Sequence, residues 1–367
     1  MKSFRIVPTI RMYETFREFE EQTQLTQEDL IITSDFIIKN FLPTTFATLI
    51  DLYQYGQGEP TDLLVEKITD AIGEKTFQRV IGIGGGTVLD VTKLFALSSI
   101  RQLDRLFDGR EKPVKDKELI LVPTTCGTGS EMTNISILEL TKKKTKKGLA
   151  DDALFANEAA LIPELLESLP YHPFATSSLD ALIHSIESYL SPHASTLSRF
   201  YSLKGLSLIL EGYMKIIHDH DARYVYLSDF LMGSTCAGIA FLNAGCGAVH
   251  AMSYPLGATY HVPHGEANYA LLMGVLKYYE KVDNQRFSLL LDELARVLSC
   301  NPNNALKTLS ELLIHILPLK PLKDYGVTAK DLSQFSRSVI ENQQRLLKNA
   351  LFPLEEKDIM TIYQSLY

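Results

Sequence analysis

The sequence predicts an N-terminal α/β domain with a parallel sheet, followed by a C-terminal domain built from helices. Two observations lead to this prediction. Up to about Pro163, short β-rich runs alternate with segments of helical periodicity, as in parallel sheets covered by helices. Beyond Pro163 the β-branched runs disappear, and nearly every segment repeats its apolar residues at helical spacing. We therefore expect an α/β domain at residues 1–163 and an all-α domain at residues 164–367.

Several elements of the first half can be placed individually. The apolar runs Leu30–Thr33, Arg79–Ile83 and Leu119–Val122 have the length and composition of buried strands. An amphipathic stretch follows the first strand and continues through Asp51. Thr61 has the character of a helix N-cap, because apolar residues recur at helical spacing after it.

Composition limits the classes of function. The 367 residues are 46% hydrophobic and 22% charged, which is ordinary for a soluble globular protein. A net charge of −8 gives no support to a nucleic-acid or membrane partner, and the N-terminus lacks the apolar region of a signal peptide. The four cysteines show no CxxC spacing and suggest reduced thiols. We expect a cytoplasmic enzyme that acts on a small molecule. We also expect a homo-oligomer, although no feature of the composition indicates the oligomeric state.

Histidines and a carboxylate predict a metal site. The segment AGCGAVHAMSYPLGATYHVPHGEAN contains His250, His261 and His264. Asp180 and His184 lie four residues apart in a predicted helix, which puts both side chains on one face. Carboxylate and imidazole donors together suit Zn²⁺ or Fe²⁺. A single Asp/His pair is more often a surface pair or a satisfied hydrogen bond, so the two further histidines carry the metal interpretation.

A glycine-rich segment predicts a phosphate site. Gly84, Gly85 and Gly86 follow a buried strand and open a helix, where glycine lets the backbone approach a bulky anion. Thr87 is a candidate N-cap, and Asp90 could complete a turn like a capping box. The N–H groups of such a helix start attract phosphate. A tight turn without a ligand is the alternative, and the segment is not the GxGxxG fingerprint.

A hydroxyl-rich segment, TTCGTGSE, follows the next strand and contains Thr124, Thr125 and Thr128. Hydroxyl groups can donate several hydrogen bonds to a polar ligand. Open parallel sheets bind ligands at the carboxyl ends of their strands, where both glycine-rich segments lie. The phosphate site and the metal site together predict a cleft between the two domains.

Four segments resemble the iron-containing (group III) alcohol dehydrogenases: GIGGGTVLDVTK, VPTTCGTGSE, DALIHSIE and AGIAFLNAGCGAVHAMSYPLGATYHVPHG. The resemblance covers nearly the whole chain. It implies that NAD(P) and a metal bind between a Rossmann-like domain and a helical domain. The implied metal ligands are Asp180, His184, His250 and His264. The implied cofactor contacts are Gly84, Gly85, Gly86, Thr87, Asp90, Thr124, Thr125, Thr128 and Lys147. Apart from Lys147, we expect the lysine-rich run Thr141–Lys147 to be a solvated hairpin or loop.

The chain departs from the family pattern at two positions. Many relatives have a histidine, often assigned to proton transfer, where this chain has Tyr254. Proton transfer then falls to another group, with His261 as the first candidate, or to water; alternatively, His261 supports the metal ligands. NAD-preferring relatives often have an aspartate near the adenine ribose where this chain has Ser34. We expect NAD as the cofactor, and the sequence leaves NADP as an alternative.

Within the family, HAMSYPLGATYHVPHGEANY and ENQQRLL resemble members that act on 4-hydroxybutyrate. The resemblance implies reversible hydride transfer between a nicotinamide and this short hydroxy acid, which gives succinate semialdehyde. Fe²⁺ or Zn²⁺ would act as a Lewis acid on the alcohol oxygen. The alternatives are a dehydrogenase for a diol such as 1,3-propanediol or for a simple alcohol such as butanol, a dehydroquinate-synthase-like lyase, and a non-catalytic nucleotide-binding protein.

Overall fold

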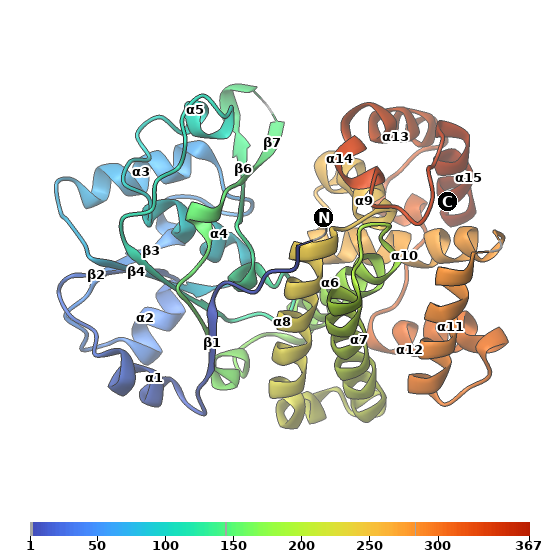
Figure 1. Cartoon of the computed structure of the whole chain (residues 1–367), viewed down its shortest axis with the longest axis horizontal. Coiled ribbons are helices and arrows are strands. Elements are labelled where there is room, and N and C mark those ends of the chain that lie inside the picture. Colours follow the sequence, from blue (N-terminus) through green and yellow to red (C-terminus); the bar gives the residue numbers. More distant parts are fainter. Residues whose placement is uncertain (1–2, 144, 283) are drawn as a thin grey trace. The chain divides into compact units, whose positions relative to one another are not determined.

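The computed structural model describes residues 3–143, 145–282 and 284–367 and divides into two compact units. We call the first the sheet unit; it comprises Ile6–Thr125 and Gly129–Leu169. The second is the helical unit, which comprises Pro170–Tyr367, Cys126–Thr128 and the described residues up to Arg5. Figure 1 shows strands gathered in the first unit and helices in the second, in agreement with the predicted fold class.

The sheet unit is built on six parallel strands (Figure 1). Their order across the sheet is β1-β8-β5-β4-β2-β3, and every neighbouring pair is parallel. The prediction of a parallel sheet is therefore confirmed. The strands are β1 (Thr9–Met12), β2 (Asp29–Thr33), β3 (Thr48–Asp51), β4 (Arg79–Gly84), β5 (Glu118–Pro123) and β8 (Glu158–Leu161).

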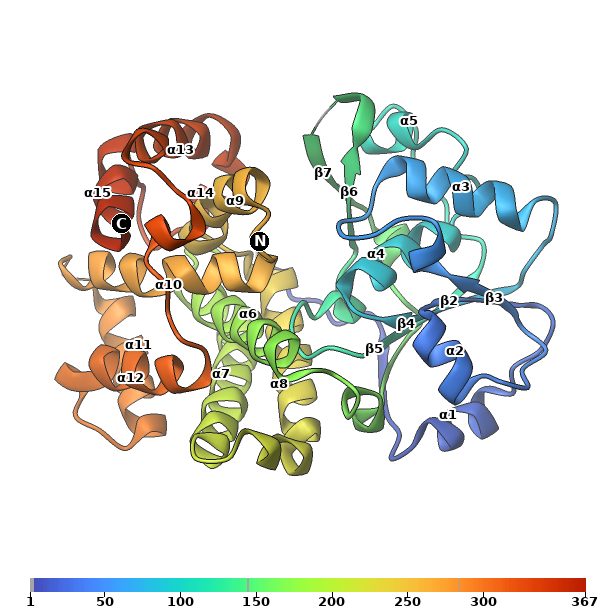
Figure 2. The same cartoon turned by 180° about the vertical axis from the view of Figure 1, so that it is seen from behind.

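Helices cover both faces of this sheet (Figures 1 and 2). Successive strand residues point to opposite faces, so Leu30 and Ile32 belong to the core with α3, α4 and α5, while Ile31 belongs to the core with α1 and α2. The helices are α1 (Phe16–Thr23), α2 (Asp35–Phe41), α3 (Asp62–Ile72), α4 (Gly86–Phe95) and α5 (Leu103–Phe107).

The stretch after β2 differs from the prediction. Helix α2 ends at Phe41 instead of continuing through Asp51, because Pro43 disfavours the helical conformation at the residue before it and cannot donate a helical hydrogen bond. The chain then enters β3, which pairs in parallel with β2. The start of α3 is as predicted, since Thr61 Oγ1 accepts a hydrogen bond from Leu64 N at 3.1 Å.

A separate antiparallel hairpin is formed by β6 (Ile135–Leu140) and β7 (Thr145–Ala150). The lysine-rich run Thr141–Lys147 forms the turn and the start of β7. Its described residues are exposed or half-buried, so the predicted solvated hairpin is confirmed for them. Lys144 lies outside the described residues.

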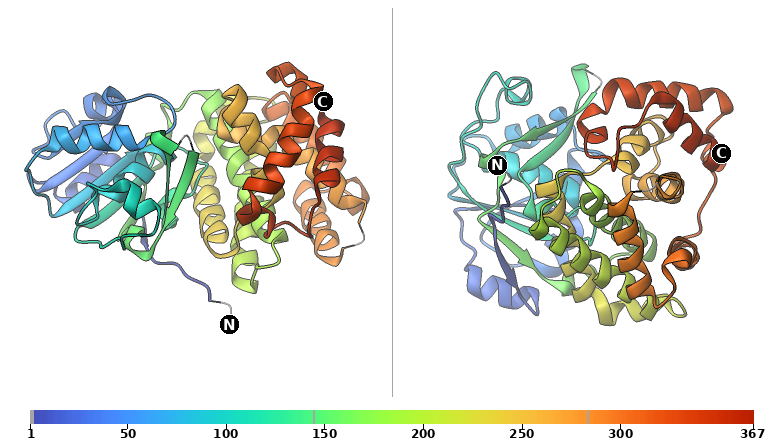
Figure 3. Two further views of the ribbon diagram at one scale, coloured as in Figure 1. Left: turned by 90° about the horizontal axis from the view of Figure 1, so that it is seen from above. Right: turned by 45° about the vertical axis from the view of Figure 1, so that its right-hand side comes forward.

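The helical unit contains no strand among the residues that the structure describes from Pro170 onward. Helices α6, α7 and α8 pack against one another, and Figures 2 and 3 show them side by side in green and yellow. The helices are α6 (Tyr171–Leu190), α7 (Thr196–Ile216), α8 (Leu227–Ala244), α9 (Ala248–Tyr260), α10 (His264–Glu280), α11 (Gln285–Leu298), α12 (Ala305–Ile316), α13 (Ala329–Asn342), α14 (Gln344–Leu347) and α15 (Glu356–Leu366).

One stretch of the helical unit, His220–Ala244, is long and apolar enough by composition to cross a membrane. In the structure 61% of its most apolar window is buried, where α8 packs against α6 and α7. Its hydrophobicity is thus accounted for by its place in the core of the helical unit.

Candidate metal centre and nucleotide-binding segments

Helix α6 carries the first two residues of a buried cluster. Asp180 and His184 lie one turn apart, and only 2% and 5% of their surfaces are exposed. Asp180 Oδ2 lies 3.8 Å from His184 Nδ1. The spacing of four residues predicted that these two side chains share a face of the helix, and the structure brings them together.

His250 and His264 reach the same carboxylate from two other helices. His250 lies in the first turn of α9, and His264 is the first residue of α10. Their Nε2 atoms lie 3.6 and 3.8 Å from Asp180 Oδ1. Gly265 permits this approach, because a Cβ there would collide with the Thr176 carbonyl oxygen of α6. The four residues predicted as metal ligands therefore lie together, with the imidazoles of His184, His250 and His264 around the Asp180 carboxylate.

Two further side chains hold this cluster in place. Glu187 Oε2 accepts a hydrogen bond from His250 Nδ1 at 2.7 Å, and Glu187 Oε1 accepts one from Val249 N at 2.6 Å. Asn268 Nδ2 donates to Asp180 Oδ1 at 2.7 Å. A carboxylate partner such as Glu187 fixes the ring orientation and tautomer of a metal-binding histidine, and the amide of Asn268 orients the ligand carboxylate.

Sequence reasoning missed both of these partners, although the sequence carries a signal for each. Glu187 lies seven residues, about two helical turns, after Asp180. Asn268 lies four residues, about one turn, after His264. Polar residues at helical spacing from a predicted ligand are therefore the pattern that would have identified them.

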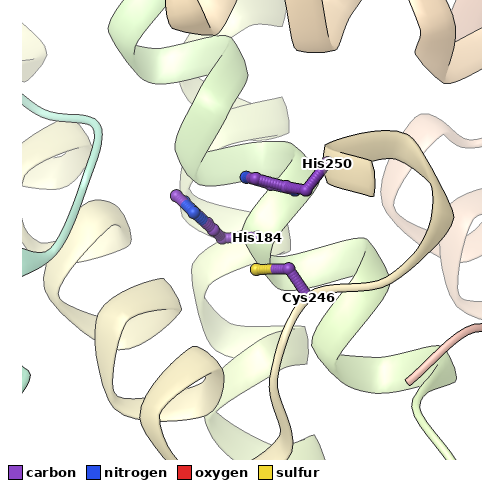
Figure 4. A group of neighbouring side chains, drawn as sticks. All are labelled: His184, Cys246 and His250. Atoms are coloured by element: carbon purple, nitrogen blue, oxygen red, sulfur yellow. The ribbon is translucent and has the colours of Figure 1, made fainter. Parts of the chain in front are cut away.

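The cluster fits a metal ion, because it holds buried nitrogen atoms without hydrogen-bond partners. Among the described residues, His184 Nδ1 and His250 Nε2 are buried and have none. Such atoms are costly in a protein interior unless a ligand satisfies them. Donor atoms of Asp180, His250 and His264 all lie within 4.8 Å of one another, and those of His184, Cys246 and His250 do the same (Figure 4). These donors suit Fe²⁺ or Zn²⁺.

The electrostatics of the cluster favour a bound cation. Burial alone would raise the pKa of Asp180, but the neighbouring imidazoles outweigh it and hold that pKa well below its usual range. Burial lowers the pKa of His184 to about 4. For His250 burial opposes protonation, but Cys246 and Asp180 outweigh burial and hold its pKa well above the usual value. A metal needs an ionised carboxylate and neutral imidazoles, so protons and a metal ion compete for this cluster.

The two residues predicted for catalysis lie in different surroundings. The Tyr254 ring is half-buried and lies 6.5 Å, centroid to centroid, from the His264 ring in an edge-on arrangement. His261 is exposed and ends α9 in the left-handed conformation, with φ at 54°. Tyr254 is thus a neighbour of the cluster, and His261 precedes His264 by three residues on the surface. The roles of both stay predictions.

In the sheet unit, α4 begins at Gly86, two residues earlier than an N-cap at Thr87 would place it. Its N-cap is Gly85, so the prediction of Thr87 as N-cap is wrong. Gly85 takes the extended cap conformation itself, and it has no side chain to bond the N–H groups of the first turn. These N–H groups and the positive end of the helix dipole fit a phosphate. Gly86 and Thr87 lie in that first turn.

The hydroxyl-rich segment lies beside this helix start. Thr124 N donates to the Gly84 carbonyl oxygen at 3.0 Å. A Cβ on Gly85 would lie 3.3 Å from Thr125 Cγ2, so the Thr125 side chain faces the glycine cap. Thr128 is half-buried farther along the same segment. The two segments predicted to bind the cofactor therefore adjoin each other at Gly84 and Gly85.

Asp90 has a different local role from the predicted one. Its Oδ1 atom accepts hydrogen bonds from Ser130 Oγ at 2.5 Å and from Lys93 Nζ at 3.2 Å. Its Oδ2 atom accepts one from Ile137 N at 3.0 Å. The predicted capping turn is wrong, because these contacts direct the carboxylate towards Ser130 and β6. A direct contact of Asp90 with the cofactor stays a prediction.

The remaining predicted cofactor residues have partners within the sheet unit. Ser34 is the N-cap of α2, and its Oγ accepts a hydrogen bond from Ile37 N at 3.5 Å. Lys147 Nζ donates to Asp108 Oδ1 at 2.9 Å, while Lys143 Nζ donates to Asp108 Oδ2 at 2.6 Å. Lys147 would have to exchange this carboxylate for a cofactor oxygen in order to bind the ribose.

The sequence matches two profiles that together span most of the chain. Residues 11–163 match "Iron-containing alcohol dehydrogenase", and residues 174–367 match "Fe-containing alcohol dehydrogenase family, C-terminal". The chain is 44% identical over 371 aligned positions to 4-hydroxybutyrate dehydrogenase of Clostridium kluyveri, and the alignment covers 100% of both chains. It is 32% identical to long-chain-alcohol dehydrogenase 1 of Geobacillus thermodenitrificans, over 92% of this chain and 89% of that protein.

Solved structures share the fold at lower identity. Sulfoacetaldehyde reductase from Bifidobacterium kashiwanohense, solved in complex with NAD⁺, aligns with a TM-score of 0.87 at 22% identity, over 100% of this chain and 98% of that one. A 1,3-propanediol oxidoreductase aligns with a TM-score of 0.84 at 20% identity, over 100% of both chains. These matches confirm the fold class.

Proposed function

Because the chain belongs to the iron-containing alcohol dehydrogenase family, we propose that it catalyses the reversible, NAD(P)-linked oxidation of 4-hydroxybutyrate to succinate semialdehyde. The observation that carries the proposal is the full-length similarity to a 4-hydroxybutyrate dehydrogenase, in a chain whose buried carboxylate has three imidazoles around it. The histidine and aspartate cluster supports a metal-dependent alcohol oxidation, and the sequence similarity supports 4-hydroxybutyrate as the substrate.

Asp180, His184, His250 and His264 would hold one divalent ion, Fe²⁺ or Zn²⁺. When bound, such an ion supplies a Lewis acid that lowers the pKa of the substrate hydroxyl. Glu187 holds His250 through Nδ1, which leaves Nε2 directed towards Asp180. The ligand set would thus be oriented before the metal arrives.

The start of α4 would hold the cofactor pyrophosphate through the N–H groups after Gly85. Thr124, Thr125 and Thr128 would supply hydroxyl donors beside it, and Lys147 and Ser34 would lie towards the riboses. Asp90 would act indirectly, because its contacts with Ser130 and Ile137 hold the segment after the threonines. A bound nicotinamide supplies the hydride acceptor. NAD is the expected cofactor, with NADP as the alternative.

His261 would pass the substrate proton to solvent, since it is exposed and follows the helix that carries His250. Tyr254 would shape the surroundings of His264, because its ring meets that imidazole edge-on. The predictions of a homo-oligomer and of a cytoplasmic location belong to the same proposal, and they can be checked by sedimentation and by cell fractionation.

A substrate panel tests the proposed function. The purified chain is loaded with Fe²⁺ under anaerobic conditions and, separately, with Zn²⁺, and it is assayed with 4-hydroxybutyrate, butanol and 1,3-propanediol. We expect the highest kcat/KM for 4-hydroxybutyrate with NAD, with stoichiometric NADH release and succinate semialdehyde as the product. A higher kcat/KM for butanol or the diol would contradict the substrate assignment. No cofactor reduction with any alcohol would contradict the dehydrogenase assignment.

A further inference from the structure

Cys246 lies beside the histidine cluster and was not among the predicted ligands. Its donor atom lies within 4.8 Å of donor atoms of His184 and His250. All three side chains are buried, with at most 5% of the residue surface exposed. Figure 4 shows Cys246, from the loop before α9, with its sulfur directed towards the two rings.

The backbone that carries this thiol is fixed on several sides. Ser191 Oγ donates to the Ala244 carbonyl oxygen at 2.7 Å, which ties the loop to the end of α6. Asn349 Nδ2 donates to the Cys246 carbonyl oxygen at 2.9 Å. Gly245 has φ at 79°, and a Cβ there would collide with the Asn349 side chain. The chain therefore holds the backbone at Cys246 in one place, while the side-chain torsion stays adjustable.

Two of the three residues in this group also carry unsatisfied donor atoms. His184 Nδ1 and His250 Nε2 are buried and lack hydrogen-bond partners among the described residues. Tetrahedral Zn²⁺ with typical bond lengths spaces its nitrogen and sulfur ligands about 3.3–3.6 Å apart. Donor atoms within 4.8 Å of one another reach that spacing with shifts on the order of 1 Å, which side-chain torsions supply.

We propose that His184, Cys246 and His250 form a sulfur-containing metal site that overlaps the Asp180, His250 and His264 donor set. Because His250 belongs to both sets, the proposal places one ion where the two sets overlap. The inference rests on the proposed function in taking His184 and His250 as metal ligands, and it adds a thiolate to them. Cys246 binds as the thiolate, and its proton leaves to solvent.

The sulfur changes which ions the centre holds. Thiolate is a soft donor that favours Zn²⁺ and its analogues, whereas a carboxylate with imidazoles is a donor set for Fe²⁺ as well. The chain would thus hold thiophilic ions more tightly than a centre built from Asp180 and the three histidines alone. Removal of the thiol should weaken Zn²⁺ binding by at least about tenfold and change Fe²⁺ binding little.

Cobalt substitution tests the proposal directly. The full chain is stripped of metal and titrated with Co²⁺, and its near-ultraviolet absorption is recorded together with the cobalt content. We expect a thiolate-to-cobalt charge-transfer band that saturates at one ion per chain. Cys246→Ser and Cys246→Val should bind cobalt without the band. Cys236→Ser is the matched control, since Cys236 is a buried thiol on α8 outside the donor set, and it should keep the band.

The outcomes separate this inference from the proposed function. Bound cobalt without the band in the unmodified chain would overturn the sulfur site and leave the dehydrogenase proposal intact. No cobalt binding at all would overturn both. Any cobalt that His264→Ala binds should still give the band, because the sulfur set does not use His264. Thermal melting of each variant establishes that it is folded. The charge-transfer band of the unmodified chain tests the proposal even if a variant fails to fold.

Discussion

Two buried charged clusters, one in each unit, differ in whether their polar atoms are satisfied. In the sheet unit, Lys93 is fully buried, and its Nζ donates to Asp90, Ser130, Thr133 and the Ile135 carbonyl oxygen. In the helical unit, Asp180 is equally buried, but the two rings beside it, His184 and His250, each retain a nitrogen without a hydrogen-bond partner among the described residues.

The difference indicates what each cluster does. A buried network whose members are all paired specifies and stabilises a local structure. Burial lowers the pKa of Lys93, and the neighbouring Asp90 carboxylate opposes this effect. A buried cluster with unpaired donors is costly unless something binds to it. We therefore expect mutations in the first cluster to affect stability and mutations in the second to affect metal binding.

The largest expected effect is that of His264→Ala. Its side chain is 44% exposed, so its loss should change the free energy of unfolding by less than about 1 kcal/mol. Loss of one metal ligand should lower turnover of 4-hydroxybutyrate by roughly 1,000-fold or more, since the Lewis acid is lost or misplaced. Anaerobic Fe²⁺ analysis and urea unfolding measure the two effects. Full Fe²⁺ content in the variant would contradict the assignment of His264.

Asp90→Asn should show the reverse pattern. It leaves the Lys93 ammonium buried without its carboxylate and should lower the free energy of unfolding by about 3 kcal/mol. The Fe²⁺ content of the folded variant should be unchanged, because Asp90 belongs to the sheet unit. Urea unfolding and metal analysis are again the measurements. An unchanged urea midpoint would show that this network does not stabilise the sheet unit.

Glu187→Gln should weaken metal binding by about 10- to 100-fold, as is typical when the partner of a metal-bound histidine is changed. The amide cannot supply the charge that Glu187 Oε2 offers to His250 Nδ1. Competition with a fluorescent chelator gives the metal Kd. Asn268→Asp is the matched comparison on the other side of the cluster, where a donor to Asp180 is removed. Unchanged Kd values in both variants would mean that these contacts only support the helices.

The smallest effects are expected around the cluster. His261 adopts a left-handed conformation that Asn tolerates, so His261→Asn removes the imidazole without backbone strain. It should lower kcat by about tenfold, less than the roughly 100-fold of an enclosed acid–base group, because water can replace an exposed one. Tyr254→Phe should change kcat less, since the ring is retained. If kcat in His261→Asn equals that of the unmodified chain at every pH, His261 does not transfer the proton.

The sequence alone predicted the parallel sheet, the helical second half and the meeting of Asp180 with His184. These depend on local periodicity, which a sequence shows directly. The meeting of His250 and His264 with Asp180 followed from family resemblance, and spacing alone left it open. The contacts of Asp90 and the position of Cys246 could not be predicted, because they depend on residues from other elements, such as Ser130 and Asn349.

The start of α4 illustrates why local rules fail at a particular residue. A threonine N-cap can accept a hydrogen bond from the first turn through its side-chain oxygen, which glycine cannot, and this made Thr87 the expected cap. In the structure the preceding Gly85 lies against Thr125 and takes the cap conformation instead. This close approach to a neighbouring loop is possible because glycine has no Cβ. The same reason applies to Gly265, whose missing Cβ lets α10 approach α6.

The most direct test of the account is the metal content of the active chain. Protein purified anaerobically should contain about one Fe²⁺ or Zn²⁺ per chain, and a chelator should remove the ion and the oxidation of 4-hydroxybutyrate in parallel, with both restored when the ion is added back. Full turnover by a metal-free preparation would contradict the central claim that Asp180, His184, His250 and His264 serve as a metal centre.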